Sequence, residues 1–351
     1  MTFLILLIFP LLVAVASFIF LKGITWKEFA LHVGAQLIVA GAATGILLWK
    51  DTSDTEVWNG YVTNKAQVYV SCSHSYPCNC RPSCSGSGKN KSCTTVCDIC
   101  YEHSNDWDWD IYTSNQEIIT IDRIDSRGSW APPRWQAIQF GEPTAKRHSY
   151  TNYIKAAPGT LFRHQGNKGK YVIPTYPQHI YDYYKLNRLV SQVPVDAVPW
   201  NEGLSKVNAE LGGKKQANMI VVLTDQPDDW YYALEEAWVG GKKNDVILVI
   251  GMKDGKAAWT QVMAWTTAEI FKIKLRDAIL ALPAVTPEAT LTALRDNVEQ
   301  YYQRKHMKDF EYLQASVTPS SLGLGISIII GLLVAIGLAY VFHRYDVFGD
   351  E

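Results

Sequence analysis

The sequence predicts an α+β membrane protein in which three transmembrane helices, an N-terminal hairpin and a C-terminal helix, carry a large extracytoplasmic domain. Three observations predict this class. Long apolar blocks stand near both ends of the chain, and residues 51–320 between them are mixed in character and foldable. All seven cysteines fall between Cys72 and Cys100 in that middle region. We therefore expect the domain to contain a Cys-rich knuckle and an α/β module.

Composition excludes one broad class of function. The chain has 33 Lys and Arg against 34 Asp and Glu, so its formal net charge is −1. A nucleic-acid-binding protein needs an excess of positive charge, which this composition does not provide. Charged residues make up 19% of the chain, below the roughly 25% of soluble proteins. An ordinary cytosolic enzyme is therefore not expected.

The first apolar block, Thr2 to Leu21, carries no charge and can cross a hydrocarbon layer of about 30 Å. We expect a retained helix and not a cleaved signal peptide, because no basic residues precede the apolar run.

The positions of the apolar blocks divide the chain into six segments. The predicted segments are helix one with its loop (1–28), helix two (29–50), a β-rich region (51–194) with a Cys-rich insert (72–103), an α/β module (195–310), helix three (321–343) and a tail (344–351).

Charges near the blocks predict the orientation. Lys22 and Lys27 lie in the hairpin loop and Arg344 lies in the tail, so the positive-inside rule places both in the cytoplasm and the domain outside. Lys50 and Arg304 on the domain side oppose this signal.

Small residues recur in the membrane blocks and predict contacts between helices. We expect these contacts to form a homo-oligomer. The predicted interface residues are Gly323, Ser327, Gly331, Ala335 and Ala339 in helix three, with Gly41 and Gly45 in helix two.

The Cys-rich insert predicts a cross-linked structure of one of two kinds. Disulfides suit an outside compartment, but seven is an odd number, so one thiol would be left free or paired between chains. Two tetrahedral zinc ions need eight ligands, which seven thiolates and one histidine supply. The candidate zinc ligands, which are otherwise disulfide partners, are Cys72, His74, Cys78, Cys80, Cys84, Cys93, Cys97, Cys100 and His103. Either cross-link is structural, since a closed site leaves no open position for substrate.

The Asp-Trp-Asp-Trp-Asp segment at 106–110 has two interpretations. A calcium loop would take ligands at Asp106, Asp108, Asp110, Tyr112, Ser114 and Glu117, but Ile111 stands where that loop requires glycine. Alternation with period two predicts a strand instead, with Trp107, Trp109 and Ile111 on one face and the aspartates on the other.

The rest of the domain changes character near Trp200. Residues 129–199 are rich in aromatic residues and proline, which predicts short strands, loops and one helix over 179–190. After Trp200 the pattern is α/β. The predicted elements are helices at 202–211, 229–240, 267–282 and 287–308, with strands at 218–224, 245–251 and 257–265.

Residues 195–305 resemble a TPM domain, a module of certain envelope and thylakoid-lumen proteins. The residues that carry the resemblance are the strand Ile220–Thr224, the segment Lys243–Ile250 and the hairpin Lys253-Asp254-Gly255-Lys256. The resemblance implies a module outside the cytoplasm, with phosphatase activity and calcium binding in some members. Asp245 replaces a family glycine, and Ala264-Trp265-Thr266 replaces a glycine-rich turn, which puts such a site in doubt.

The front half resembles uncharacterised membrane proteins encoded by tailed phages, on the segments 72–76, 78–80 and 100–103. That family has no assigned reaction. The resemblance implies a bacterial inner membrane with the domain in the periplasm.

Motifs of common enzymes are missing from the sequence: it has no Gly-x-Ser-x-Gly elbow, His-Glu-x-x-His pair, P-loop or dinucleotide fingerprint. The best acidic group, Asp225, Asp228 and Asp229, follows a predicted strand, where carboxylates bind ligands or cap the next helix. We expect a membrane scaffold that presents its outer domain to a protein partner. The alternative is a metal-assisted, phosphatase-like hydrolase that uses these three aspartates. A transporter component is the weaker third hypothesis.

Overall fold

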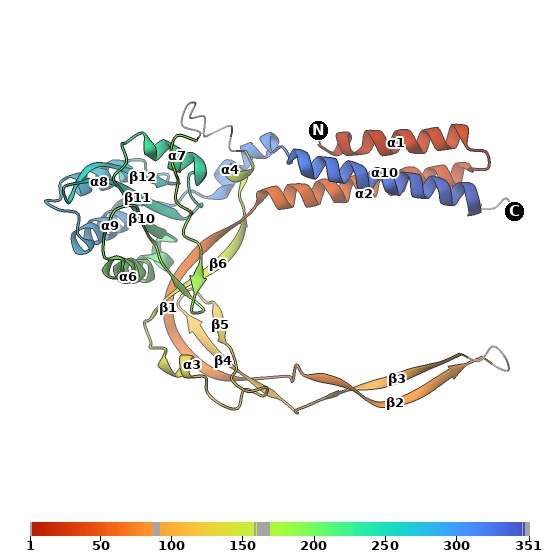
Figure 1. Ribbon diagram of the computed structural model, residues 1–351, viewed down its shortest axis with the longest axis horizontal. Helices are drawn as coiled ribbons and strands as arrows, with labels where there is room; N and C mark the ends of the chain where they lie inside the picture. Colours follow the sequence, from red (N-terminus) through yellow and green to blue (C-terminus); the bar gives the residue numbers. More distant parts are fainter. Residues whose placement is uncertain (1, 87–91, 158, 160–168, 346, 348–351) are drawn as a thin grey trace.

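The structure is a computed structural model that describes residues 2–86, 92–157, 159, 169–345 and 347. Three helices form a bundle that projects from the remainder of the chain (Figure 1). Each is long and apolar enough to cross a membrane, as the sequence predicts. A capping box between Thr25 and Glu28 fixes the turn into the second helix. The helices are α1 (Thr2–Phe20), α2 (Trp26–Thr52) and α10 (Ser321–Tyr345).

Small residues of α10 allow close packing inside this bundle. A Cβ atom at Gly331 would meet the Pro10 ring of α1 at 2.9 Å, so only glycine fits there without displacement. The predicted interface residues of α10 thus lie at or near contacts within one chain: Gly323 faces α2, Ser327 is half-buried, and Ala335 and Ala339 are buried. By contrast, a Cβ atom at Gly41 or Gly45 would meet no atom within 4 Å. The open part of the predicted oligomer interface is therefore on α2.

The first sheet begins where α2 ends. Strand β1 (Ser53–Val70) follows α2 without a loop and pairs first with β6 (Pro143–Thr151) and then with β4 (Asp106–Thr113). Strand β5 (Ile118–Ile121) completes the antiparallel order β5-β4-β1-β6. A register shift between Val62 and Asn64 in the pairing with β4 lies next to the point where the partner of β1 changes from β6 to β4.

The segment Asp106–Thr113 is a strand, as its alternation predicts, although Trp107 of the predicted apolar face is only half-buried and packs against Tyr69. Trp109 and Ile111 are buried in a core with Ile121. On the opposite face Asp110 accepts a hydrogen bond from the Thr120 hydroxyl at 2.6 Å. The calcium-loop alternative is wrong, because Asp106–Thr113 pairs with β1 along its whole length instead of coiling around an ion.

The second sheet lies in an α/β unit with the order β12-β11-β10-β9. Strands β9, β10 and β11 are parallel, and β12 returns antiparallel to β11. Helices α6, α8 and α9 cover one face of the sheet and α7 covers the other, so every residue of β10 is buried. The strands are β9 (Leu189–Ser191), β10 (Asn218–Thr224), β11 (Asp245–Lys253) and β12 (Lys256–Ala264), and the helices are α6 (Ala197–Lys215), α7 (Trp230–Ala237), α8 (Ile270–Leu280) and α9 (Pro287–Tyr301).

A buried polar network joins the two sheets. The Asn59 amide of β1 donates hydrogen bonds to Asn208 of α6 and Asn218 of β10, and Arg188 contacts both Asn59 and Asn218. Helix α6 approaches β1 so closely that a Cβ atom at Gly212 would overlap Asn59. The two units are therefore held by specific contacts and not by a loose linker.

Asp245, the first residue of β11, is fully buried beside this network. Its carboxylate accepts hydrogen bonds from the Asn218 amide at 2.9 Å and from the Tyr176 hydroxyl and the Lys242 backbone, both at 2.7 Å. Burial raises the pKa of Asp245 to about 6 although these donors act in the opposite direction.

The remaining elements are short. Residues 179–190 contain β7 (Ile180–Tyr181), β8 (Lys185–Leu186) and the start of β9, so the predicted helix there is wrong. Positive φ angles at Asp182 and Tyr183 turn the chain sharply between β7 and β8. The others are α3 (Pro133–Ala137), α4 (Tyr153–Ala156) and the 3-10 helix η2 (Met307–Ser316), which precedes α10.

Candidate metal centre at the base of a disulfide-linked arm

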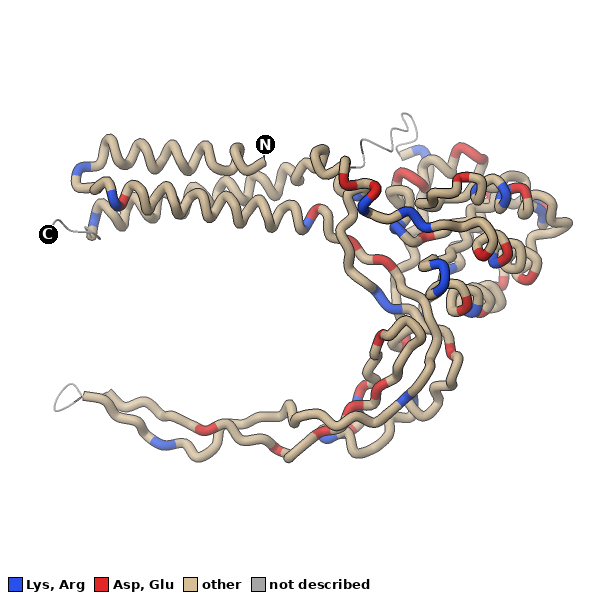
Figure 2. The backbone as a smooth tube through the Cα atoms, turned by 180° about the vertical axis from the view of Figure 1, so that it is seen from behind, with Lys and Arg blue, Asp and Glu red and all other residues tan. Residues whose placement is uncertain are grey.

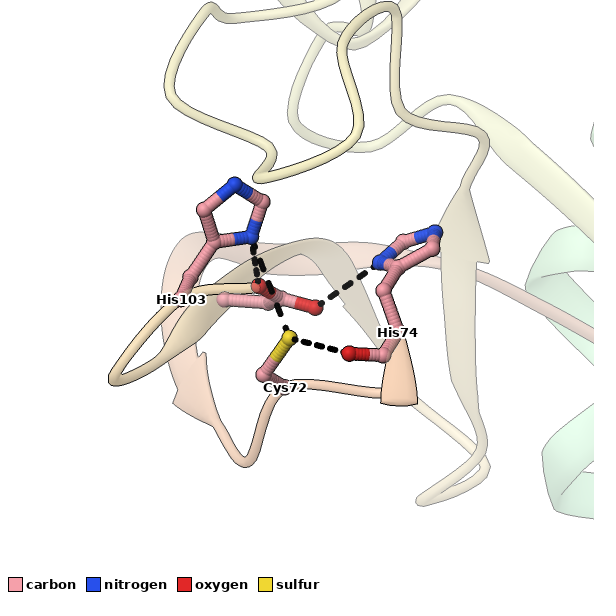
Figure 3. A group of neighbouring side chains, drawn as sticks. Cys72, His74 and His103 are labelled. Atoms are coloured by element: carbon pink, nitrogen blue, oxygen red, sulfur yellow. Dashed lines mark hydrogen bonds and ion pairs between the residues drawn. The ribbon is translucent and has the colours of Figure 1, made fainter. Parts of the chain in front are cut away.

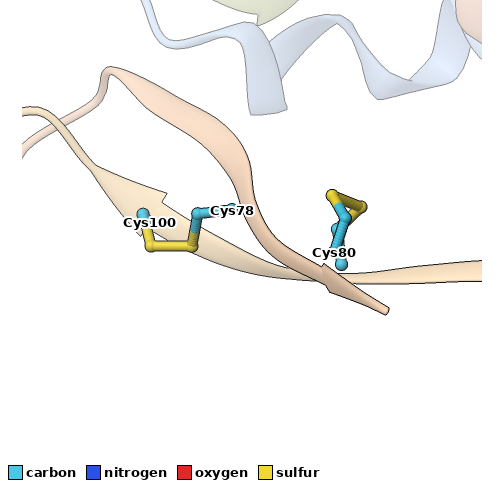
Figure 4. Close-up of a disulfide and its surroundings, with 4 residues drawn as sticks. Cys78, Cys80 and Cys100 are labelled. Carbon is cyan, nitrogen blue, oxygen red and sulfur yellow. A yellow bond between two sulfur atoms is a disulfide. The ribbon is translucent and has the colours of Figure 1, made fainter. Parts of the chain in front are cut away.

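The Cys-rich insert forms a long two-stranded arm. Strands β2 (Ser75–Ser85) and β3 (Ser92–Tyr101) pair antiparallel and extend far from the first sheet (Figure 1). Three nested disulfides join the strands: Cys78–Cys100, Cys80–Cys97 and Cys84–Cys93. Figure 4 draws the Cys78–Cys100 disulfide with the one formed by Cys80 beside it. The arm is thus an extended ribbon and not the compact knuckle expected from the sequence.

These pairs correct the zinc hypothesis for six of the seven cysteines. A sulfur in a disulfide has no thiolate to offer a metal, so Cys78, Cys80, Cys84, Cys93, Cys97 and Cys100 are not zinc ligands. Cys72 remains as the one free cysteine of the chain, and it is buried. Of the two alternative cross-links, disulfides thus hold for six cysteines, and Cys72 is the thiol that an odd number leaves outside them.

The free thiol lies at the base of the arm among three other polar side chains (Figure 3). Cys72 and His74 stand between β1 and β2, whereas His103 follows β3 and Asp106 begins β4. One ligand atom of each residue lies within 4.8 Å of every other. A backbone hydrogen bond from Glu102 to the His74 carbonyl closes the base at 3.1 Å.

The distances among these atoms are short. Nδ1 of His103 lies 3.1 Å from Oδ1 of Asp106 and 3.8 Å from the Cys72 sulfur. Nδ1 of His74 lies 3.7 Å from Oδ2 of the same aspartate. Both rings therefore turn the same nitrogen toward Asp106, as Figure 3 shows.

Asp106 is the electrostatic centre of the cluster. Its side chain is fully buried, which alone would raise its pKa. Donors from the Ser73 backbone, Arg123 and His103 outweigh that effect and lower the pKa of Asp106 to about 2. Arg123 reaches Asp106 at 2.9 Å and also Asp108 at 2.7 Å, so its guanidinium bridges two carboxylates of one strand.

The sequence identifies three of these four residues, Cys72, His74 and His103, as zinc candidates. Asp106 is predicted from the sequence only as a calcium ligand, and Arg123 is not predicted as part of any site. The spacing His103-x-x-Asp106 is the signal that could have found the fourth residue, since it places a carboxylate shortly after the second histidine.

The three aspartates of the hydrolase hypothesis do not converge on a common point. Asp229 forms an ion pair with Lys170 at 2.5 Å and accepts a hydrogen bond from the Tyr171 hydroxyl. Asp225 accepts a hydrogen bond from Gln226, and Asp228 is exposed. Asp229 occupies the N-cap position of α7 but makes no side-chain capping bond. Among the residues that the structure describes, the group at the base of the arm is the one that could hold a metal.

Comparison with known proteins gives no match: no family model, no curated protein and no solved structure is similar to this chain.

Proposed function

We propose that the protein is a membrane-anchored interaction protein that presents its disulfide-linked arm to a protein partner outside the cytoplasm. The observation that carries this proposal is the arm itself. Its described side chains are exposed apart from three half-buried cysteines, and none belongs to a hydrophobic core. Three disulfides thus stiffen a segment that adds nothing to the packing of its own chain, which is expected of a surface that contacts another molecule.

The direction of the arm supports a protein partner. The arm leaves the first sheet in the same direction in which the bundle leaves the domain (Figures 1 and 2). Lipid does not surround a two-stranded ribbon, because the ribbon has unpaired backbone groups along both edges and the charges of Arg81 and Asp98. A protein strand satisfies such an edge by adding to it.

The arm also carries apolar side chains that a partner would cover. Tyr76, Val96, Ile99 and Tyr101 are all exposed, and Ile99 is 70% exposed. Exposed apolar and aromatic side chains of this kind are enriched in the buried centres of interfaces.

Disulfides and charge together support the proposed location. Disulfides persist in oxidising compartments, which supports an arm outside the cytoplasm. Lys22 lies in the loop between α1 and α2 and Arg344 in the last turn of α10, and Figure 1 draws both of these ends remote from the domain, as the positive-inside rule requires for that orientation. In a bacterial host the domain would lie in the periplasm.

Self-association through α2 is part of the proposal. Gly41 and Gly45 lie one turn apart on the outer surface of the bundle, where a second copy can approach closely. Such assembly would present several arms together.

The test is site-specific photo-crosslinking in the membranes of the host. A photoreactive residue at Val96 or Ile99 should give a discrete adduct with one protein, identified by its mass, and a second copy of this chain counts as such a protein. The matched control is Asp254, which is exposed in the turn between β11 and β12. If the arm positions give no more adduct than Asp254, the arm is not the contact surface and the proposal fails.

A further inference from the structure

We propose that Cys72, His74, His103 and Asp106 bind one zinc ion at the base of the arm. This inference goes beyond the interaction function, because it assigns a metal to the joint between the arm and the first sheet. Zinc bonds of about 2.0 to 2.3 Å place two tetrahedral ligands about 3.3 to 3.6 Å apart. Three of the separations in the cluster are 3.1, 3.7 and 3.8 Å, the first two to different oxygens of Asp106, and one ligand atom of each residue lies within 4.8 Å of every other. The side chains would therefore have to close in around the ion, mainly along the longer separations.

The donor set suits zinc. The disulfides remove six sulfurs and leave one thiol, two imidazoles and one carboxylate, which are the four ligands of a closed tetrahedral site. The arm therefore combines both cross-links that the sequence left as alternatives: disulfides along its length and a metal at its base.

Charge also favours a bound dication. With Cys72 bound to the metal as a thiolate, the thiolate, Asp106 and Asp108 would carry three negative charges, and Arg123 supplies one positive charge between the two aspartates. A zinc ion adds the two positive charges that balance the group. The Ser73 backbone and Arg123 hold Asp106 in place, which is how outer partners orient metal ligands.

The position of the cluster indicates what the ion does. Pairing of β1 with β4 ends at Val70 and Asp106, and pairing of β2 with β3 begins at Ser75 and Tyr101. The two segments between these pairs are joined by a backbone hydrogen bond from Glu102 to His74 and by the contact of the Cys72 sulfur with His103. Zinc would bind ligands from both segments and so fix the angle between the arm and the sheet.

Cobalt substitution of the full chain in detergent tests this site. Metal-free protein, purified through a tag without histidine, should bind one Co²⁺ per chain and develop both tetrahedral d–d bands and a sulfur-to-cobalt charge-transfer band. Zinc should displace the cobalt and slow the alkylation of Cys72. The purified protein should also contain one zinc by elemental analysis.

Variants assign the ligands. Cys72→Ser should abolish the charge-transfer band, and His74→Gln should weaken Co²⁺ binding at least tenfold. His74 is the most exposed of the four ligands, with 43% of its side chain accessible, so its replacement leaves the fold intact. His179→Gln, at an exposed histidine outside the cluster, is the matched control and should bind like the parent protein.

Two results would overturn the inference. One is a parent protein that binds neither zinc nor cobalt while its Cys72 thiol alkylates freely. The other is metal binding that both cluster variants leave unchanged. Neither result depends on the partner of the arm, so failure here is distinguishable from failure of the proposed function.

Discussion

Replacement of Asp245 by asparagine perturbs the buried carboxylate at the junction of the two sheets while keeping the size of the side chain. Burial places the pKa of Asp245 at about 6 in the folded protein, against about 3.9 in an unfolded chain. Because the folded pKa is raised, this group stabilises the fold below about pH 4 and the stabilisation is lost as the pH rises through about 6. A tenfold difference in proton affinity between the folded and unfolded chains corresponds to about 1.4 kcal/mol of unfolding free energy.

The expected magnitude follows from the difference between these two pKa values. Between pH 4 and pH 7 the wild-type protein should lose about 2 kcal/mol of unfolding free energy through Asp245, whereas Asp245→Asn has no such group to titrate. The unfolding free energy of the variant minus that of the wild type should therefore rise by about 2 kcal/mol over this range. The absolute stability of the variant also depends on its hydrogen bonds to Tyr176 and Lys242. Their contribution is the same at every pH, so it cancels when the stability difference at one pH is compared with that at another.

The assay is denaturant unfolding of the detergent-solubilised protein, followed by tryptophan fluorescence, at closely spaced pH values from below the unfolded pKa to above the folded one. Asp254→Asn in the exposed β11–β12 turn controls for a general effect of removing one negative charge. A difference between Asp245→Asn and wild type that stays constant across this range would refute the reasoning.

Two further predictions concern the bundle and the arm. Gly331→Leu should lower the thermal stability of the monomer by about 1–3 kcal/mol through overpacking against Pro10, whereas Gly325→Leu, which faces open space, should not; equal effects in a melting experiment would count against the packing described. Joint replacement of Cys80 and Cys97 by serine should make the arm sensitive to protease, while the melting temperature of the domain should change little because the described residues of the arm belong to no hydrophobic core. A large fall in that temperature would contradict this.

The sequence predicts the α/β unit and the bundle well because burial there leaves a strong periodic signal. Strand β10 is a continuous apolar run, and the structure has it at Asn218–Thr224, the range predicted from the sequence. An apolar run of this kind indicates a buried strand whichever residues pack against it. The predicted helix over 179–190 failed because positive φ angles at Asp182 and Tyr183, which no apolar pattern reports, break the chain into short strands.

The candidate site was only partly predictable, because it depends on pairings between distant residues. The cysteine positions do not show whether Cys78 pairs with Cys100 or binds metal, until the β2–β3 register brings the two residues together. The same register brings His74 near His103. Asp106 joins them only because β4 pairs with β1, so strand topology and not local sequence assembles the fourth ligand.

The unbroken passage from α2 into β1 has a mechanical consequence. The helix ends at Thr52, the strand begins at Ser53, and the same strand runs on to Val70 at the base of the arm. No flexible segment lies in this path to absorb rotation. A change in the tilt of α2, caused by membrane thickness or by association with a second copy, would therefore reach the base of the arm. With the joint at residues 71–74 held by the proposed metal, a small angular change at the bilayer would become a wide displacement at the arm.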